Sequence, residues 1–174
     1  MTHVVASVTV LCATALLAAC AVNPSAGPRA QAKLEARSGS TVAGTVTLTQ
    51  VANKVRIEAS LTGLTPGEHG FHVHEVGDCS AADASSAKGH FNPAGKGHGH
   101  HHGPERHAGD LPNLVADAAG RATYRAEVDM LTLDKGPMGI VGRSLVVHAD
   151  PDDYRSQPAG NSGKRVACGV IAGV

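Results

Sequence analysis

The feature that most constrains the fold of this chain is a regular alternation of apolar and polar residues in two neighbouring stretches. In residues 42–49, valine and leucine alternate with threonine, and in residues 54–61, Val, Ile, Ala and Leu alternate with Lys, Arg, Glu and Ser. Side chains on a β-strand point alternately to its two faces, so this period of two predicts antiparallel strands with one buried face and one face in water. The break at Asn53 predicts a hairpin turn between them.

The rest of the chain predicts further strands and shows no long helical period. Aromatic residues make up only 2 % of the chain, so the core must be built from smaller aliphatic residues, which favours β-structure. The 21 glycines and 9 prolines suit short strands joined by many turns. The further candidate strands are residues 70–75, 114–118, 121–129, 139–148 and 165–171. We expect one all-β domain, an antiparallel β-sandwich or flattened barrel.

Two long irregular segments interrupt the alternation. The first, Val76–Asp110, is rich in Gly, Ser, Ala and His, and the second, Ala149–Lys164, contains Asp-Pro-Asp-Asp, Gln-Pro and Asn-Ser-Gly. A loop of such length inside a compact domain is functional or disordered. Metal ligands would order the first loop without a core of its own.

The N-terminus predicts export and a lipid anchor. The first twenty residues contain no acidic residue and form an apolar run that ends in small residues, which is typical of a signal peptide. Leu17–Cys20 resembles a bacterial lipobox, although the start carries His3 and neither Lys nor Arg. The alternatives are an ordinary secretory peptide or a buried helix. We expect a signal peptide at residues 1–19, a flexible tether over residues 20–40 that is anchored to a membrane through lipidated Cys20, and a folded domain over residues 41–174, in the bacterial cell envelope, facing the periplasm or the cell surface.

The four cysteines sort by position. Cys12 lies in the predicted signal peptide and Cys20 would carry the lipid, which leaves Cys79 and Cys168. This even pair lies in a compartment that permits disulfides, and the alternative is two buried thiols. A bridge would close a loop of about 90 residues, for which the chain-entropy model gives roughly 4 to 5 kcal/mol.

Histidine is the outlier in an otherwise balanced composition. Lys+Arg and Asp+Glu number 15 each, so the chain has no basic field to hold nucleic acid. All of the 11 histidines except His3 lie between His69 and His148. On a strand, His72 and His74 would point to one face and could reach one ion. Imidazoles suit copper and zinc, and a carboxylate can complete a tetrahedral zinc site, whereas a purely structural role does not account for so many histidines.

Four segments closely resemble motifs of the copper/zinc superoxide dismutase family. They are Gly70–Glu75, Gly89–Pro93, Arg106–Leu111 and Ala167–Ile171, and their order and approximate spacing also match. The resemblance runs from about Thr41 to the C-terminus. It implies a Greek-key, immunoglobulin-like β-sandwich or flattened barrel with two long functional loops. It also implies an enzyme that dismutes superoxide to dioxygen and hydrogen peroxide, and it leaves both a homodimer and a monomer open.

The resemblance further implies one copper and one zinc site. The copper ligands would be His72, His74, His90 and His148, with His90 as the imidazolate that bridges to zinc. Zinc would also bind His107, Asp110 and a third histidine. Counting from His90 to His107 without a gap selects His98, whereas counting back from Pro104 selects His101. We favour His98, which is followed by glycine as in the family pattern.

Several other residues resemble supporting residues of the family. Asp152 would link the copper and zinc ligands through hydrogen bonds, with a plain loop aspartate as the alternative. Cys79 and Cys168 would form the intrachain disulfide. Arg165 would lie beside the copper, with a solvated edge charge as the alternative. His69 is expected to be a packed, hydrogen-bonded residue and not a ligand.

The resemblance assigns chemical roles to these residues. His90 would release copper on reduction and take up a proton, and Arg165 would dock the superoxide anion. Lys164 and Lys135 are candidates for steering the anion, and the second loop resembles the family's electrostatic loop.

Two other functions are open. A lipid-anchored store for copper or zinc could use the cluster in Gly97–His102, and a purely structural sandwich would need no metal. His100, His101 and His102 could also capture scarce metal and pass it to the adjacent sites. The alternative is a solvated loop, since a His-rich tract is only compositional evidence.

Overall fold

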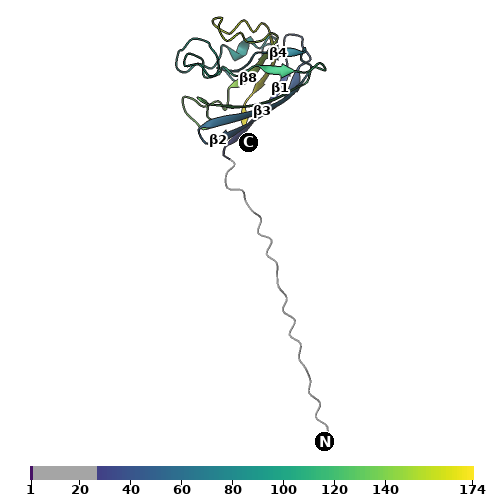
Figure 1. Ribbon diagram of the computed structural model, residues 1–174, viewed down its shortest axis with the longest axis vertical. Coiled ribbons are helices and arrows are strands. Elements are labelled where there is room, and N and C mark those ends of the chain that lie inside the picture. The colour runs from purple at the N-terminus through teal and green to yellow at the C-terminus, as the bar shows by residue number, and fades with distance from the viewer. Residues whose placement is uncertain (2–26) are drawn as a thin grey trace.

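The structure, a computed structural model, describes Met1 and residues 27–174, and it is built from antiparallel strands (Figure 1). The predicted signal peptide and Cys20 lie outside the described residues. In chain order the strands are β1 (Arg29–Ala36), β2 (Ala43–Val51), β3 (Lys54–Thr62), β4 (Gly67–His69), β5 (Phe71–His74), β6 (Leu114–Ala116), β7 (Ala122–Val128), β8 (Ser144–His148), β9 (Arg165–Val170) and β10 (Ala172–Gly173). A single 3₁₀ turn, Ser85–Ala87, is the only helical element in this part of the chain. The predicted all-β class is confirmed.

The strands form one large curled sheet in the order β5-β8-β9-β1-β2-β3-β7, with β10 also on β1, and a small sheet of β4 and β6. At the β5 end of this sheet, neighbouring strands are far apart in the sequence. There β8 lies between β5 and β9, and β9 pairs with β1. This crossing pattern matches the expected Greek-key arrangement. Among the described residues, no helix is long and apolar enough to span a membrane.

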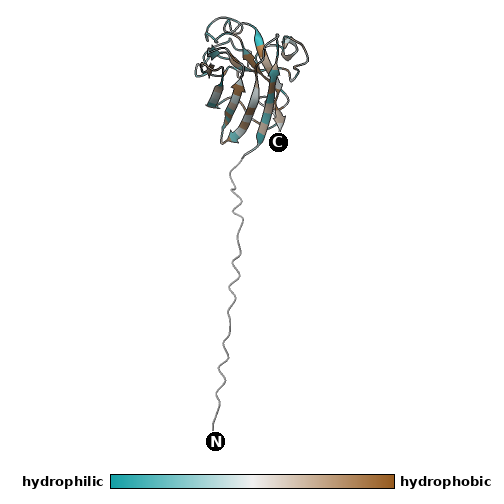
Figure 2. Cartoon of the chain, turned by 90° about the vertical axis from the view of Figure 1, so that its right-hand side faces the viewer, coloured by the Kyte–Doolittle hydropathy of each residue, from teal (hydrophilic) through white to brown (hydrophobic). Residues whose placement is uncertain are grey.

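The predicted hairpin is confirmed. β2 and β3 pair along their full length, from Ala43 opposite Thr62 to Val51 opposite Lys54. Ala52, in the turn between them, has a φ of 50°. The apolar residues of both strands point inward, and the bands of opposite hydropathy along the strands are visible in Figure 2.

The expectation that residues 29–36 belong to a flexible tether is wrong. This segment forms β1, a central strand that pairs with both β2 and β9. Ala30, Ala32 and Leu34 alternate with polar residues and are almost completely buried. Two of these three inward positions are alanines, whose weak hydrophobic signal hides the period of two in an Ala-rich segment.

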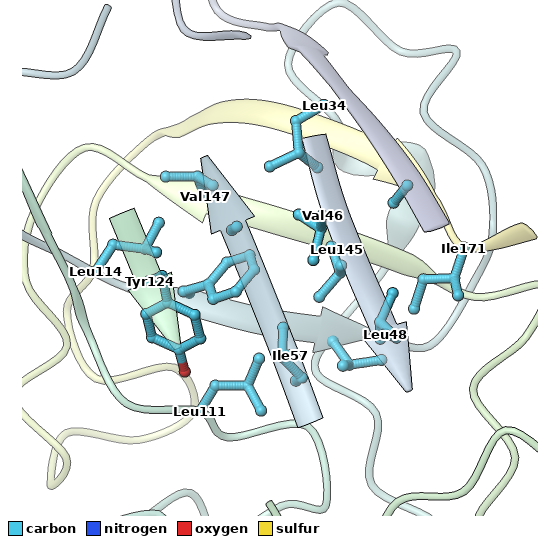
Figure 3. Close-up of a cluster of buried hydrophobic side chains, with 14 of the residues drawn as sticks. Leu34, Val46, Leu48, Ile57, Leu111, Leu114, Tyr124, Leu145, Val147 and Ile171 are labelled. Atoms are coloured by element: carbon cyan, nitrogen blue, oxygen red, sulfur yellow. The ribbon is translucent and has the colours of Figure 1, made fainter. Parts of the chain in front are cut away.

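The core lies inside the curled sheet and is aliphatic, as the composition predicts. Its labelled members in Figure 3 are Leu34, Val46, Leu48, Ile57, Leu111, Leu114, Tyr124, Leu145, Val147 and Ile171. The rings of Phe71 and Tyr124 meet edge to face with centroids 5.3 Å apart. Leu111, directly after the first loop, and Leu114, at the start of β6, join the core, so the loop is anchored immediately after Asp110.

The remaining predicted strands are present with shorter bounds. β8 begins at Ser144, five residues after the predicted start at 139. β4 and β10 were not predicted, because β4 is Gly-Glu-His without an aliphatic residue and β10 has only two residues. Neither long loop contains a strand of the sheet. The first loop contacts β5 and β9, and the second contacts β5 and β8, as described below.

Candidate metal centre

The edge strand β5 positions the first group of histidines. Phe71 and Val73 point into the core, so His72 and His74 point to the opposite face. β8 pairs with β5 and ends at His148, which brings a third imidazole to the same face. All of these side chains are buried because the first loop covers this face.

The first loop runs along the free edge of β5 and adds the shared residue. The Phe91 N–H donates to the Val73 carbonyl oxygen at 2.8 Å, and the Val73 N–H donates to Gly109 at 3.0 Å. A Cβ at Gly109 would lie 2.2 Å from the Val73 oxygen, so only glycine allows this approach. These bonds place His90 opposite His74 and Asp110 opposite His72.

The four-histidine group, His72, His74, His90 and His148, has one nitrogen of each ring within 4.8 Å of the others. The inward-facing nitrogens His72 Nδ1 and the Nε2 atoms of the other three are buried and have no hydrogen-bond partner. A buried polar atom without a partner is costly, and four that converge on one point fit a bound cation.

The opposite nitrogen of three of these rings is held by an acceptor. His72 Nε2 donates to Asp152 Oδ2 at 2.7 Å, His74 Nδ1 to the Lys88 oxygen at 2.9 Å, and His148 Nδ1 to the Gly163 oxygen at 3.3 Å. Each acceptor fixes the tautomer so that the lone pair of the other nitrogen faces the centre of the group.

Burial keeps these rings neutral. It lowers the pKa values of His74 and His148 well below the ordinary value, and the neighbouring imidazoles lower them further. Burial, together with His72, also lowers the pKa of His90 to about 4, against the opposing effect of Asp110. Neutral imidazoles with free lone pairs are the form that binds metal.

The second group combines three imidazoles with one carboxylate: His90, His98, His107 and Asp110. Asp110 Oδ1 lies 2.9 Å from His90 Nδ1, 3.0 Å from His98 Nδ1 and 3.3 Å from His107 Nδ1. Ligands on a tetrahedral zinc ion with bonds of about 2.0 Å are separated by about 3.3 Å. His98 Nδ1 makes no hydrogen bond despite its short distance to Asp110, so the group is shaped for an ion at its centre.

Asp110 is ionised and oriented by the first loop. Its Oδ2 accepts hydrogen bonds from the backbone N–H groups of His107 at 2.8 Å and Gly99 at 3.1 Å, which turns Oδ1 toward the three rings. Burial alone would raise the pKa of Asp110, but its close contacts with the rings of His107, His90 and His98 outweigh burial and hold the pKa far below its usual range.

The structure places His98, and not His101, in the second group. Gln157 on the second loop fixes the backbone of His98: its Nε2 donates to the His98 oxygen at 2.8 Å and its Oε1 accepts from the His98 N–H at 2.9 Å. The following Gly99 packs closely on the Glu105 carbonyl, where a Cβ would lie 2.1 Å from the oxygen. The direct count from His90 therefore selects the residue that the geometry brings to this group.

His90 and Asp152 connect the two groups. His90 Nε2 faces the first group and its Nδ1 faces the second. Asp152 accepts from His72 Nε2 at 2.7 Å and from His98 Nε2 at 2.9 Å, and so ties one ring of each group to a single carboxylate. Asn113 in turn holds the Asp152 backbone, with its Oδ1 3.0 Å from the N–H and its Nδ2 3.1 Å from the oxygen.

Arg165 and the disulfide lie beside the first group. Arg165 is paired with His148 in the β8–β9 register, and its Nη1 donates to the Ala84 oxygen at 2.7 Å. Cys79 and Cys168 form a disulfide with a Cα–Cα distance of 5.7 Å, which fastens the start of the first loop to β9. Burial lowers the pKa of Arg165, although an arginine stays charged in proteins.

Sequence reasoning missed three supporting residues. Asn113 and Gln157 act on the backbones of Asp152 and His98, and Arg37 donates from Nε to the Cys79 oxygen at 2.8 Å. Side chains that hold backbone atoms of distant segments leave no local pattern in a sequence, so no signal was available to find them.

The remaining candidates lie outside both groups. His69 Nδ1 contacts the His148 oxygen at 2.9 Å and its Nε2 contacts the Thr65 oxygen at 2.8 Å, as expected for a packed, hydrogen-bonded residue. Lys135 and Lys164 are both exposed, and Lys164 directly precedes Arg165.

Known proteins are similar to this chain over most of the described domain. The family described as copper/zinc superoxide dismutase matches residues 42–171. A superoxide dismutase [Cu-Zn] of Aquifex aeolicus is 44 % identical over 135 residues, which are 75 % of this chain and 79 % of that protein. One of Paramecium bursaria Chlorella virus 1 is 44 % identical over 137 residues, or 75 % and 72 %.

Two further relatives carry other names. The copper chaperone for superoxide dismutase of Rattus norvegicus is 45 % identical over 139 residues, which are 76 % of this chain but 49 % of the rat protein. The solved structure of the clock protein EA4 superposes with a TM-score of 0.76 at 45 % identity and covers 83 % of this chain and 93 % of that one. The match over most of the domain, with both groups of ligands in place, shows that the chain belongs to the copper/zinc superoxide dismutase family.

Proposed function

We propose that this protein is a superoxide dismutase that uses copper in the four-histidine group and zinc in the group that contains Asp110. The observation that carries the proposal is His90, whose two ring nitrogens face two different sets of buried, convergent ligand atoms. Family membership alone is not sufficient, because a relative that is 45 % identical, against 44 % for the dismutases, is named a copper chaperone.

The chemistry of the donor sets supports this allocation. Three imidazoles and one carboxylate at tetrahedral spacing suit zinc, whereas four imidazoles suit copper. When bound, copper supplies reversible one-electron exchange, which zinc does not. One superoxide anion can therefore lose an electron and become dioxygen, while another gains an electron and takes up protons to become hydrogen peroxide.

The protein's own residues bind the anion and supply a proton. One Arg165 N–H is committed to Ala84, and the remaining donors of the guanidinium are available to hold superoxide beside His148. His90 keeps Nδ1 in the second group and can carry a proton on Nε2, on the side where the substrate would bind. Asp152 keeps the rings of His72 and His98 from turning.

The activity can be tested directly against the metal-store and chaperone alternatives. Purified protein loaded with copper and zinc should consume superoxide rapidly, and His148→Ala should abolish this activity because it removes one of the four imidazoles. Arg165→Gln should retain both metals and lower the rate by at least about tenfold, since a fixed cation accelerates the encounter with an anion. If the loaded protein is no faster than His148→Ala, the protein binds metal without catalysing dismutation.

We also propose that the protein is exported and lipid-anchored at Cys20, and that it protects the cell envelope from superoxide. The N-terminal sequence and the Cys79–Cys168 disulfide, which suits an oxidising compartment, support this. Metabolic labelling with a fatty acid should mark the wild type and not Cys20→Ala. Absence of label from the wild type would contradict the lipid anchor and favour export without one.

A further inference from the structure

Three histidines on the first loop belong to neither group of ligands. His100, His101 and His102 follow Gly99 on the loop, and their rings pack together in one stack. The rings of His100 and His101 are stacked with centroids 4.1 Å apart, and the ring of His102 is tilted against that of His101 by 56° with centroids 4.3 Å apart. Tyr154 from the second loop packs on this stack, 4.8 Å from the ring of His100 and 5.6 Å from that of His101. The three imidazoles are thus held together by the fold.

The stack borders a cavity that also contains carboxylates. A cavity of about 240 Å³ lies between the first loop and the end of β7, and His101, His102, Glu127 and Asp129 are among the residues that line it. Imidazole nitrogens and carboxylate oxygens in one concave site are the ligand types that zinc takes from proteins.

His101 and His100 each offer a nitrogen atom for an ion. His101 Nδ1 is buried and has no hydrogen-bond partner, although a buried polar atom normally has one. The backbone N–H of His102 donates to His100 Nδ1 at 3.2 Å, which leaves Nε2 as the nitrogen with which His100 can bind an ion. Burial, with His100 and His102, lowers the pKa of His101 to about 4, so this ring is neutral.

The charged neighbours limit how tightly an ion would bind. Lys54 lines the same cavity. Each carboxylate is also paired with an arginine, since Arg56 Nη2 lies 2.7 Å from Glu127 Oε1 and Arg106 Nη2 lies 2.6 Å from Asp129 Oδ1. These cations oppose a bound cation, so the site differs from the fully buried second group. His100 and His102 are exposed and can turn from the stack toward the cavity without displacing core side chains.

We propose that His100, His101 and His102, with the carboxylates of this cavity, form a third metal site that binds one Zn²⁺ weakly and reversibly. The site lies on the loop segment between His98 and His107, which both belong to the second group. It requires neither copper nor dismutase activity, and it therefore stands apart from the proposed function.

The test uses the full protein with its two main sites already filled by copper and zinc. ZnCl₂ is titrated into this protein in a buffer that does not chelate metal, and binding is followed by calorimetry and by metal analysis after equilibrium dialysis. The wild type should take up one further zinc equivalent. The triple variant His100→Gln, His101→Gln, His102→Gln should lose that equivalent while it keeps its original copper and zinc.

Two other variants make the result specific. Glu105→Gln removes an exposed carboxylate from the same loop but not from the cavity lining, and it should keep the third equivalent. If the triple variant does not retain copper and zinc, the single variant His101→Gln is tested in its place. Its affinity for the added zinc should be at least tenfold lower than that of the wild type. Uptake by the triple or single variant equal to that of the wild type, or no further uptake by the wild type, would overturn the proposal.

Discussion

The β2–β3 hairpin and the first loop, residues 76–110, are stabilised by different interactions. The hairpin has a continuous ladder of backbone pairs and buries Val46, Leu48 and Ile57 in the main core. The loop has few residues in that core and is tied down by the disulfide, by backbone contacts to β5 and by side chains that converge on two groups of ligands. The comparison teaches that apolar burial organises the sheet, whereas polar contacts among the ligand side chains and their partners organise the site.

Removal of both metals should give the largest effect and should separate the two regions. An ion present at a thousandfold excess over its Kd stabilises the folded state by about 4 kcal/mol. At about 2–4 °C per kcal/mol for a domain of this size, loss of both ions should lower Tm by about 15–30 °C. Calorimetry before and after chelation measures the shift.

Hydrogen exchange on the metal-free protein shows where the stability was lost. Amides of residues 76–110 and 149–164 should exchange much faster after chelation, while those of β2 and β3 should stay protected. Equal loss of protection in the hairpin and in both loops would mean that the two regions form one cooperative unit.

Truncation of a core side chain should destabilise the sheet and leave the metal sites intact, which is the reverse of metal removal. Leu48 is fully buried, so Leu48→Ala should lower the free energy of unfolding of the metal-free protein by about 2–5 kcal/mol through lost burial and a cavity. The folded variant should still bind one copper and one zinc in the two main groups. Thr47→Ala, on the exposed face of the same strand, should change stability by no more than about 0.5 kcal/mol. Denaturant unfolding and metal analysis test both statements, and a loss of zinc from Leu48→Ala would show that the core and the site are not separable.

Asp152→Asn should lower metal affinity with little effect on the stability of the sheet. The carboxylate holds one ring from each group, and loss of such a partner typically lowers metal affinity by about 10–100-fold. Competition with a chromophoric chelator measures zinc affinity, and Asp153→Asn serves as the matched change at an exposed neighbour. Equal zinc affinity in both variants would show that the link between the rings does not contribute.

The same division explains how much of the molecule the sequence could predict. The hairpin was predictable because large aliphatic residues alternate with charged ones, whereas β1 was missed because its inward positions are mostly alanine. The members of both ligand groups were named because histidine is rare and its motifs are specific. The direct count from His90 and the following Gly99 already favoured His98 over His101, and the fold adds the contact of Gln157 with the His98 backbone. Gln157, Asn113 and Arg37 were missed because they hold backbone atoms across long sequence separations.

Gln157 and Gln50 permit the finest comparison, because each uses a side-chain amide to hold backbone atoms in one of the two regions. Gln157 holds both backbone groups of His98. Gln50 donates to the Ala52 and Lys54 oxygens at 3.0 Å and accepts from the Leu133 N–H at 2.9 Å, far along the sheet from the ligands. Each such bond contributes about 0.5–1.5 kcal/mol.

Gln157→Ala should therefore lower zinc affinity by up to about tenfold, because His98 must be ordered again when the ion binds. Gln50→Ala should lower the free energy of unfolding by about 1–3 kcal/mol and leave zinc affinity unchanged. Chelator competition and denaturant unfolding, applied to both variants, measure the two quantities side by side. If Gln50→Ala reduced zinc affinity as much as Gln157→Ala does, zinc binding would follow global stability, and the contrast between a sheet held by burial and a site held by polar contacts would fail.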